Sequence, residues 1–109
     1  MATTREFLDF ILEQFSPLGE VRSHPMMGEY ILYYRDKYFA SVCDNRLFLK
    51  PVPSALKMLP DAPLEPSHAG ASPMILVENL DDRETLIKVV PAMYDELPLP
   101  KKRSGKRLK

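Results

Sequence analysis

The chain has 109 residues, of which 45% are hydrophobic and 28% are charged, and its formal net charge is zero. This length fits one domain with a modest core, and the sequence holds no apolar run near the ~18 residues that a membrane span needs. Cys43 is the single cysteine, which excludes an intrachain disulfide. We therefore expect a protein of a reducing compartment, the cytoplasm.

The neutral total conceals a separation of charge along the chain. Residues 98–109 contain no acid and six cations, which are Lys101, Lys102, Arg103, Lys106, Arg107 and Lys109. The remaining chain has nine cations against 15 acids, and such a surface repels nucleic-acid phosphates. We expect a folded domain over residues 1–98 and a disordered basic tail over residues 99–109, with the tail as the only contact for polyanions.

The N-terminal pattern predicts a helix over residues 4–15. Thr3 and Glu6 have the spacing of a capping box. Apolar residues then recur at steps of three and four, namely Phe7, Leu8, Ile11, Leu12 and Phe15. Ser16 and Pro17 are expected to end the helix.

Aromatic and β-branched residues predict a series of strands after this helix. The four strands are expected over residues 21–26, 30–34, 38–42 and 46–50. Pro25 suits a strand at the edge of a sheet. Because only Arg35-Asp36-Lys37 and Asp44-Asn45 separate the later strands, antiparallel hairpins are indicated.

The second half adds a short helix over residues 54–59, a proline-rich loop over 60–73 and a strand over 74–78. Asp81 is the expected cap of a last helix. Pro91 lies inside it, which predicts a kink or two abutting helices. The fold class is therefore α+β, in the order α-β-β-β-β-short α-β-α. Its economical form has two layers, a mainly antiparallel five-stranded sheet with helices on one face.

Reactive side chains do not converge in the sequence. His24, Cys43 and His68 lack the spacing of metal ligands, and the four glycines form no phosphate-binding loop. A lone cysteine at a strand end is more often an apolar packing residue than an activated thiolate. We expect no enzyme activity, no metal and no cofactor.

Two clusters have a structural interpretation beside a functional one. Tyrosines on neighbouring strands resemble a platform for stacking bases, but half-buried sheet residues are the favoured interpretation. Met26-Met27 suits a binding patch, although Met27 as a filler of the core is favoured.

The acid pair Asp95-Glu96 is unfavourable near the end of a helix, where the dipole is negative.

Five segments resemble, in order and spacing, the N-terminal domain of the TfoX/Sxy family of competence regulators, especially its short single-domain members. They are Arg5–Asp9, Pro25–Tyr30, Tyr38–Ala40, Asp44–Pro51 and Leu80–Glu84. The resemblance covers residues 4–98 and implies a two-layer fold similar to secretion chaperones. It also implies transcriptional control of DNA uptake through protein partners, without enzyme activity. The hairpin at Arg35-Asp36-Lys37 lacks the glycine often seen in the family, so a less relaxed turn is expected.

The leading hypothesis is a non-enzymatic interaction domain that acts on transcription through protein partners, and a homodimer is left open. The residues expected at a partner or ligand surface are Met26, Met27, Gly28 and Tyr30. One alternative is sequence-indifferent association of nucleic acid with the tail, for which a solubilising role is favoured. Another is a small-ligand site near Met26, Tyr30 or Cys43.

Overall fold

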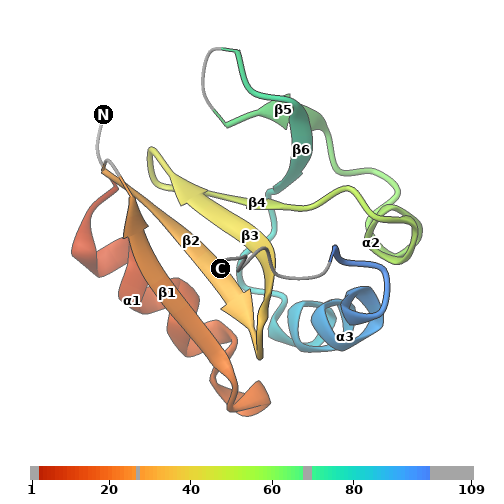
Figure 1. The fold of residues 1–109 in the computed structure, drawn as a ribbon, viewed down its shortest axis with the longest axis horizontal. Helices are drawn as coiled ribbons and strands as arrows, with labels where there is room; N and C mark the ends of the chain where they lie inside the picture. Colours follow the sequence, from red (N-terminus) through yellow and green to blue (C-terminus); the bar gives the residue numbers. More distant parts are fainter. Residues whose placement is uncertain (1–2, 27, 68–69, 99–109) are drawn as a thin grey trace, which may run out of the picture.

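The fold is a six-stranded antiparallel sheet with helices packed on one face (Figure 1). The computed structural model describes residues 3–26, 28–67 and 70–98. The elements are α1 (Arg5–Gln14), η1 (Ser16–Leu18), β1 (Val21–Met26), β2 (Glu29–Tyr34), β3 (Lys37–Cys43), β4 (Arg46–Leu49), α2 (Pro53–Met58), β5 (Leu64–Pro66), β6 (Pro73–Val77) and α3 (Arg83–Tyr94). The strand order is β1-β2-β3-β4-β6-β5. The predicted α+β class with a one-sided helical layer is confirmed, with one strand more than expected.

The additional strand, β5, lies inside the segment that the sequence predicts as a loop. It pairs with β6, and Pro66 lies opposite Pro73. Proline is tolerated here because β5 is the outermost strand, where a missing N–H breaks no ladder on the outer side. The strand with Pro25, β1, forms the other edge of the sheet, as the sequence predicts.

The two tight hairpins are built from non-glycine residues in the left-handed region. Asp44 and Asn45 have φ values of 55° and 56°, as a type I′ turn requires. Arg35 has a φ of 60°, so the expected less relaxed turn is confirmed. The loop between β2 and β3 is only Arg35-Asp36, because Lys37 already belongs to β3.

Helix α1 begins at a different cap from the predicted one. The hydroxyl of Thr4 accepts a hydrogen bond from the backbone N–H of Phe7 at 3.2 Å. Thr4 is therefore the cap, and the prediction of Thr3 is wrong. Thr3 is buried, and its hydroxyl donates to the carbonyl oxygen of Val42 in β3. A contact to a distant strand thus removes Thr3 from the helix terminus.

Helix α3 shows the same displacement by one residue. The carboxylate of Asp82 accepts from the backbone N–H of Thr85 at 3.3 Å and from its hydroxyl at 2.7 Å. Asp82 is the cap, and the prediction of Asp81 is wrong. The helix continues through Pro91 to Tyr94 as one element, so the alternative of two abutting helices is also wrong.

One apolar cluster joins the helices to the sheet face that they cover, the covered face. Its fully buried members include Leu8, Ile11, Phe15, Leu32, Phe39, Leu47, Leu49, Ile75, Leu86, Val90 and Met93. The rings of Phe15 and Phe39 meet edge to face, with centroids 5.4 Å apart. In the described part of the chain, no helix has both the length and the apolar character needed to cross a membrane.

The C-terminal end of α3 is held by two charged side chains. Lys37, only 9% exposed, donates from Nζ to the carbonyl of Tyr94 at 3.0 Å, where a cation complements the helix dipole. Glu96 accepts from the backbone N–H and the hydroxyl of Ser54, at 2.8 and 2.9 Å. Its charge therefore stabilises the first turn of α2, which explains an acid that looks unfavourable in the sequence.

Candidate functional site

The sheet face opposite the helices, the free face, has a small core of its own. Cys43, Phe48 and Met74 are buried there, with Tyr38 and Leu76 packed against them. Among the described residues, no helix contributes to this cluster. Part of the cover comes from a cation, because the guanidinium of Arg46 lies 5.0 Å from the centre of the Phe48 ring.

Four side chains form a band across the free face, the tyrosine strip of Arg22, Tyr33, Tyr38 and Lys50. The pairing of β1, β2 and β3 places Arg22 opposite Tyr33 and Tyr33 opposite Tyr38. Arg22 lies 5.4 Å from the Tyr33 ring centre, and the Lys50 ammonium lies 4.5 Å from that of Tyr38. The two rings are 6.4 Å apart. Two neighbouring aromatic rings are therefore flanked by a cation at each end of the strip.

The cations of the strip are not neutralised within the described part of the chain. Neither Arg22 nor Lys50 has a carboxylate oxygen within 4.0 Å there. Arg46 differs, since its guanidinium lies 3.8 Å from Glu65. The strip thus presents two positive charges next to partly exposed tyrosines.

Cys43 is a packing residue, as the sequence indicates. It is 6% exposed, and its thiol donates to the carbonyl of Ser67 at 3.3 Å. Burial raises the pKa of the Cys43 thiol to about 11, so the group stays protonated and weakly nucleophilic near neutral pH.

The three side chains considered as metal ligands are not assembled into one site. His24 is exposed in β1, which is separated from the strand of Cys43 by β2. His68 lies outside the described residues. Over residues 3–26, 28–67 and 70–98, no group of three His, Cys, Asp or Glu side chains is placed to hold a metal ion.

The structure divides the predicted partner surface between two sides of the sheet. Met26 is 50% exposed, and Gly28 is exposed in the following turn. Tyr30 instead packs against the core of the covered face, because successive strand residues point to opposite faces. Met27 and the six tail cations lie outside the described residues, so binding by the tail stays a prediction.

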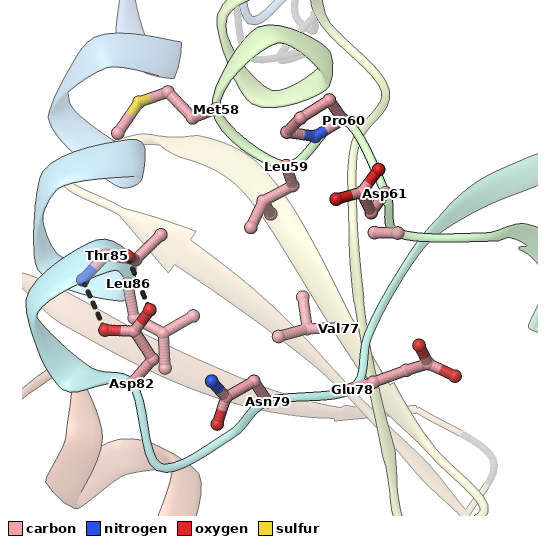
Figure 2. A pocket seen from close by; sticks show the side chains of 11 residues that line it. Met58, Leu59, Pro60, Asp61, Val77, Glu78, Asn79, Asp82, Thr85 and Leu86 are labelled. Carbon is pink, nitrogen blue, oxygen red and sulfur yellow. Dashed lines mark hydrogen bonds between the residues drawn. The ribbon is translucent and has the colours of Figure 1, made fainter.

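A pocket of about 270 Å³ opens elsewhere, between the end of α2, the end of β6 and the first turn of α3 (Figure 2). Leu59, Val77 and Leu86 supply apolar walls. Three carboxylates also line the pocket, those of Asp61, Glu78 and Asp82. Hydrogen bonding from Thr85 lowers the pKa of Asp82, which keeps this group ionised.

The sequence offers little signal for this pocket. Asp61 comes from the segment after α2, whereas Glu78 and Asp82 both lie between β6 and α3, and only the return of the chain through β6 brings these two segments together. Asp82 is recognisable in the sequence as a helix-capping type of residue, but not as the wall of a cavity. The predicted location near Met26, Tyr30 or Cys43 shares no residue with the pocket.

Comparison with known proteins identifies the family. A profile described as the TfoX N-terminal domain matches residues 13–95. The chain is also 30% identical to an uncharacterised 12.7 kDa protein in the trpE 5′ region of Spirochaeta aurantia, over 97% of this chain and 93% of the relative. The matched residues include all six strands of the sheet, the whole tyrosine strip and every residue that lines the pocket. The chain therefore belongs to the TfoX N-terminal domain family.

Proposed function

We propose that this chain is a non-enzymatic, cytoplasmic protein-binding domain, related to competence regulators, that acts as a transcriptional co-regulator. Its docking surface is the free face, and the observation that carries this function is the tyrosine strip. Two partly exposed tyrosines lie beside two cations that have no carboxylate partner in the described structure. Membership of the family supports the regulatory part of the proposal.

The chemistry of the strip favours an acidic protein segment as partner. Tyrosine and arginine are among the side chains most enriched at the energetic centres of protein interfaces. Arg22 and Lys50 attract carboxylates and guide their approach, since complementary charge raises association rates. Ile31 and Leu76, both partly exposed, extend the apolar surface beside them. A segment that alternates acids with apolar residues matches this pattern.

A single strand of nucleic acid also suits stacked aromatics flanked by cations. The charge of the whole body opposes it, because residues 1–97 have nine cations against 15 acids. The excess of acids repels a nucleic acid along its full length, whereas a short peptide with a few carboxylates contacts only the strip. The protein partner is therefore favoured.

The test compares two variants with the same change in net charge. Arg22→Glu/Lys50→Glu reverses the strip, whereas Lys57→Glu/Lys88→Glu reverses exposed cations of α2 and α3. Native affinity purification with quantitative mass spectrometry follows the bound proteins. We expect a partner that the wild type and the α2–α3 variant retain, and whose recovery falls at least about tenfold with the strip variant.

Equal recovery on both variants would exclude the free face as the docking surface. Nuclease treatment separates the two classes of partner. If it releases the bound material and purified single-stranded nucleic acid binds the wild type but not the strip variant, the protein-binding function is wrong. A thermal melt of each variant checks that it is folded.

A further inference from the structure

We propose that the pocket between α2, β6 and α3 binds a small organic cation, an ammonium or guanidinium group on a short apolar stem. This site is separate from the tyrosine strip. Val77 and Leu86 in its wall belong to the core of the covered face, whereas the strip lies on the opposite side of the sheet. The proposal therefore does not depend on the docking function.

The pocket has an apolar interior. Leu86 is 1% exposed and Val77 is 5% exposed, so both are fixed by the core behind them. Met58 and Leu59 pack against the same core from the end of α2. Figure 2 shows Leu59 and Val77 between the acid on the α3 side, Asp82, and that on the opposite side, Asp61. Such walls favour methylene groups over water.

The charged groups around this interior all have one sign. Its lining includes the carboxylates of Asp61, Glu78 and Asp82, and it contains no Lys, Arg or His. In the described part of the chain, none of the three has a basic nitrogen within 4.0 Å. Elsewhere acids such as Glu20 and Glu84 do have cationic partners. The pocket is thus a local excess of negative charge.

The start of α3 opposes a cation, but it does not reverse this balance. A helix N-terminus is equivalent to about half a positive charge. Asp82 already caps this terminus, and Glu84 lies in the first turn. Against half a charge stand three carboxylates of the lining, so the net field in the pocket attracts cations.

Asp82 is suited to hold a donor in a defined place. Its two oxygens accept from the N–H and the hydroxyl of Thr85 (Figure 2), which fixes the orientation of the carboxylate. A carboxylate has about four acceptor positions, so two remain for a ligand N–H. Asp61 and Glu78 are exposed and can approach the cation from the rim.

The size of the pocket limits the ligand. At about 270 Å³ it lies just below the roughly 300–1,000 Å³ of sites for drug-sized molecules. It therefore fits a group no larger than a diamine or one long basic side chain. A free amine and a lysine side chain share this chemistry, and the choice of probe separates them.

The experiment titrates the full chain with putrescine and with Nα-acetyl-lysine amide in about 0.15 M salt, where diffuse attraction is screened. Backbone amide NMR shifts report the site. We expect saturating shifts centred on Asn79 and Thr85, with n-butanol and butyrate producing none of comparable size. The probe that binds more tightly identifies the source, a free amine or a side chain of a peptide.

Two isosteric variants provide the decisive control. Asp61→Asn/Glu78→Gln removes two charges from the pocket, and Glu6→Gln/Asp95→Asn removes two exposed charges elsewhere. We expect the affinity for the cation to fall at least about fivefold in the pocket variant and to change little in the other. Equal affinities, shifts that grow without saturation, or equally strong binding of n-butanol would overturn the proposal.

Discussion

The two faces of the sheet bury apolar side chains by different means. On the covered face, α1 and α3 close over one large cluster that contains Phe15 and Phe39. On the free face, Phe48 is equally inaccessible, but its neighbours are strand side chains and the guanidinium of Arg46. Helices cover the apolar cluster of the covered face, whereas individual strand side chains cover that of the free face.

This difference determines which face is available for binding. A protein partner can reach the apolar cluster of the covered face only if a helix moves and exposes part of that cluster to water. On the free face, the guanidinium of Arg46 and the ammonium of Lys50 lie over the rings of Phe48 and Tyr38. Apolar contact area and charge are therefore offered together. The predictions below test this comparison, beginning with the largest expected effect.

Two phenylalanines of the N-terminal region test the covered face. Phe15 is fully buried, whereas Phe10 is 37% exposed. Phe15→Ala should lower the free energy of unfolding by about 3–5 kcal/mol, because it leaves a cavity and removes the ring contact with Phe39. Phe10→Ala should cost about 1 kcal/mol or less. Urea denaturation followed by circular dichroism measures both, and similar losses would contradict the assignment of the core.

Phe48 provides the corresponding test on the free face. Phe48→Ala should cost about 3 kcal/mol, the lower end of the range for such a change, because the side chain of Arg46 can partly close the gap. Tyr33→Ala, at a half-buried position of the strip, should cost about 1 kcal/mol or less. A loss below about 1 kcal/mol for Phe48→Ala would show that the free face has no core of its own.

Local patterns were sufficient to predict most of the fold. The apolar period of α1, the Asp44-Asn45 turn and Pro25 at a sheet edge all depend on residues close in sequence. The cap of α1 differs from the predicted one because a long-range bond ties Thr3 to β3, whereas the cap of α3 is decided locally, by the bonds of Asp82 with Thr85. In the sequence, Thr3 and Thr4 both lie where a helix cap is expected. The bond that ties Thr3 to Val42 spans 39 residues, so local sequence does not reveal it.

The candidate sites were not predictable from the sequence for the same reason. The tyrosine strip depends on the register between β2 and β3, including its shift at Leu32 and Tyr33. The pocket depends on the placement of two distant segments, residues 58–62 and 77–86. The role of Glu96 at Ser54 likewise joins residues 42 apart. No periodicity in the chain reports such contacts.

Cys43 gives a pH test of burial on the free face. Its native pKa is raised to about 11, and an unfolded thiol ionises near pH 8.5. The favourable contribution of the protonated Cys43 thiol to the free energy of unfolding is therefore complete below about pH 8.5. It is lost as the pH rises towards the native pKa, because the unfolded thiol ionises first. The stability of the wild type should fall relative to Cys43→Ala between pH 8 and pH 10, by urea denaturation. Parallel curves would contradict a buried thiol.

The smallest expected effect concerns Asp82, which serves both the fold and the pocket. Hydrogen bonds from Thr85 lower its pKa, so its contribution is present above the unfolded value of about 3.9 and is lost as the pH falls through the lower native value. Asp82→Ala should lower the Tm at pH 7, and the difference from the wild type should shrink below about pH 4. Asp81→Ala is the matched control and should leave the Tm nearly unchanged.

Asp82→Asn separates the two roles of this residue. Asparagine is as good a helix cap as aspartate, so the Tm at pH 7 should stay close to that of the wild type, and the part of its acid dependence that comes from Asp82 should disappear. The negative charge in the pocket is reduced at the same time, so the affinity for putrescine should fall. If the Tm and the affinity instead fall together, Asp82 affects the pocket only through the stability of α3, and its charge is not what a cation recognises.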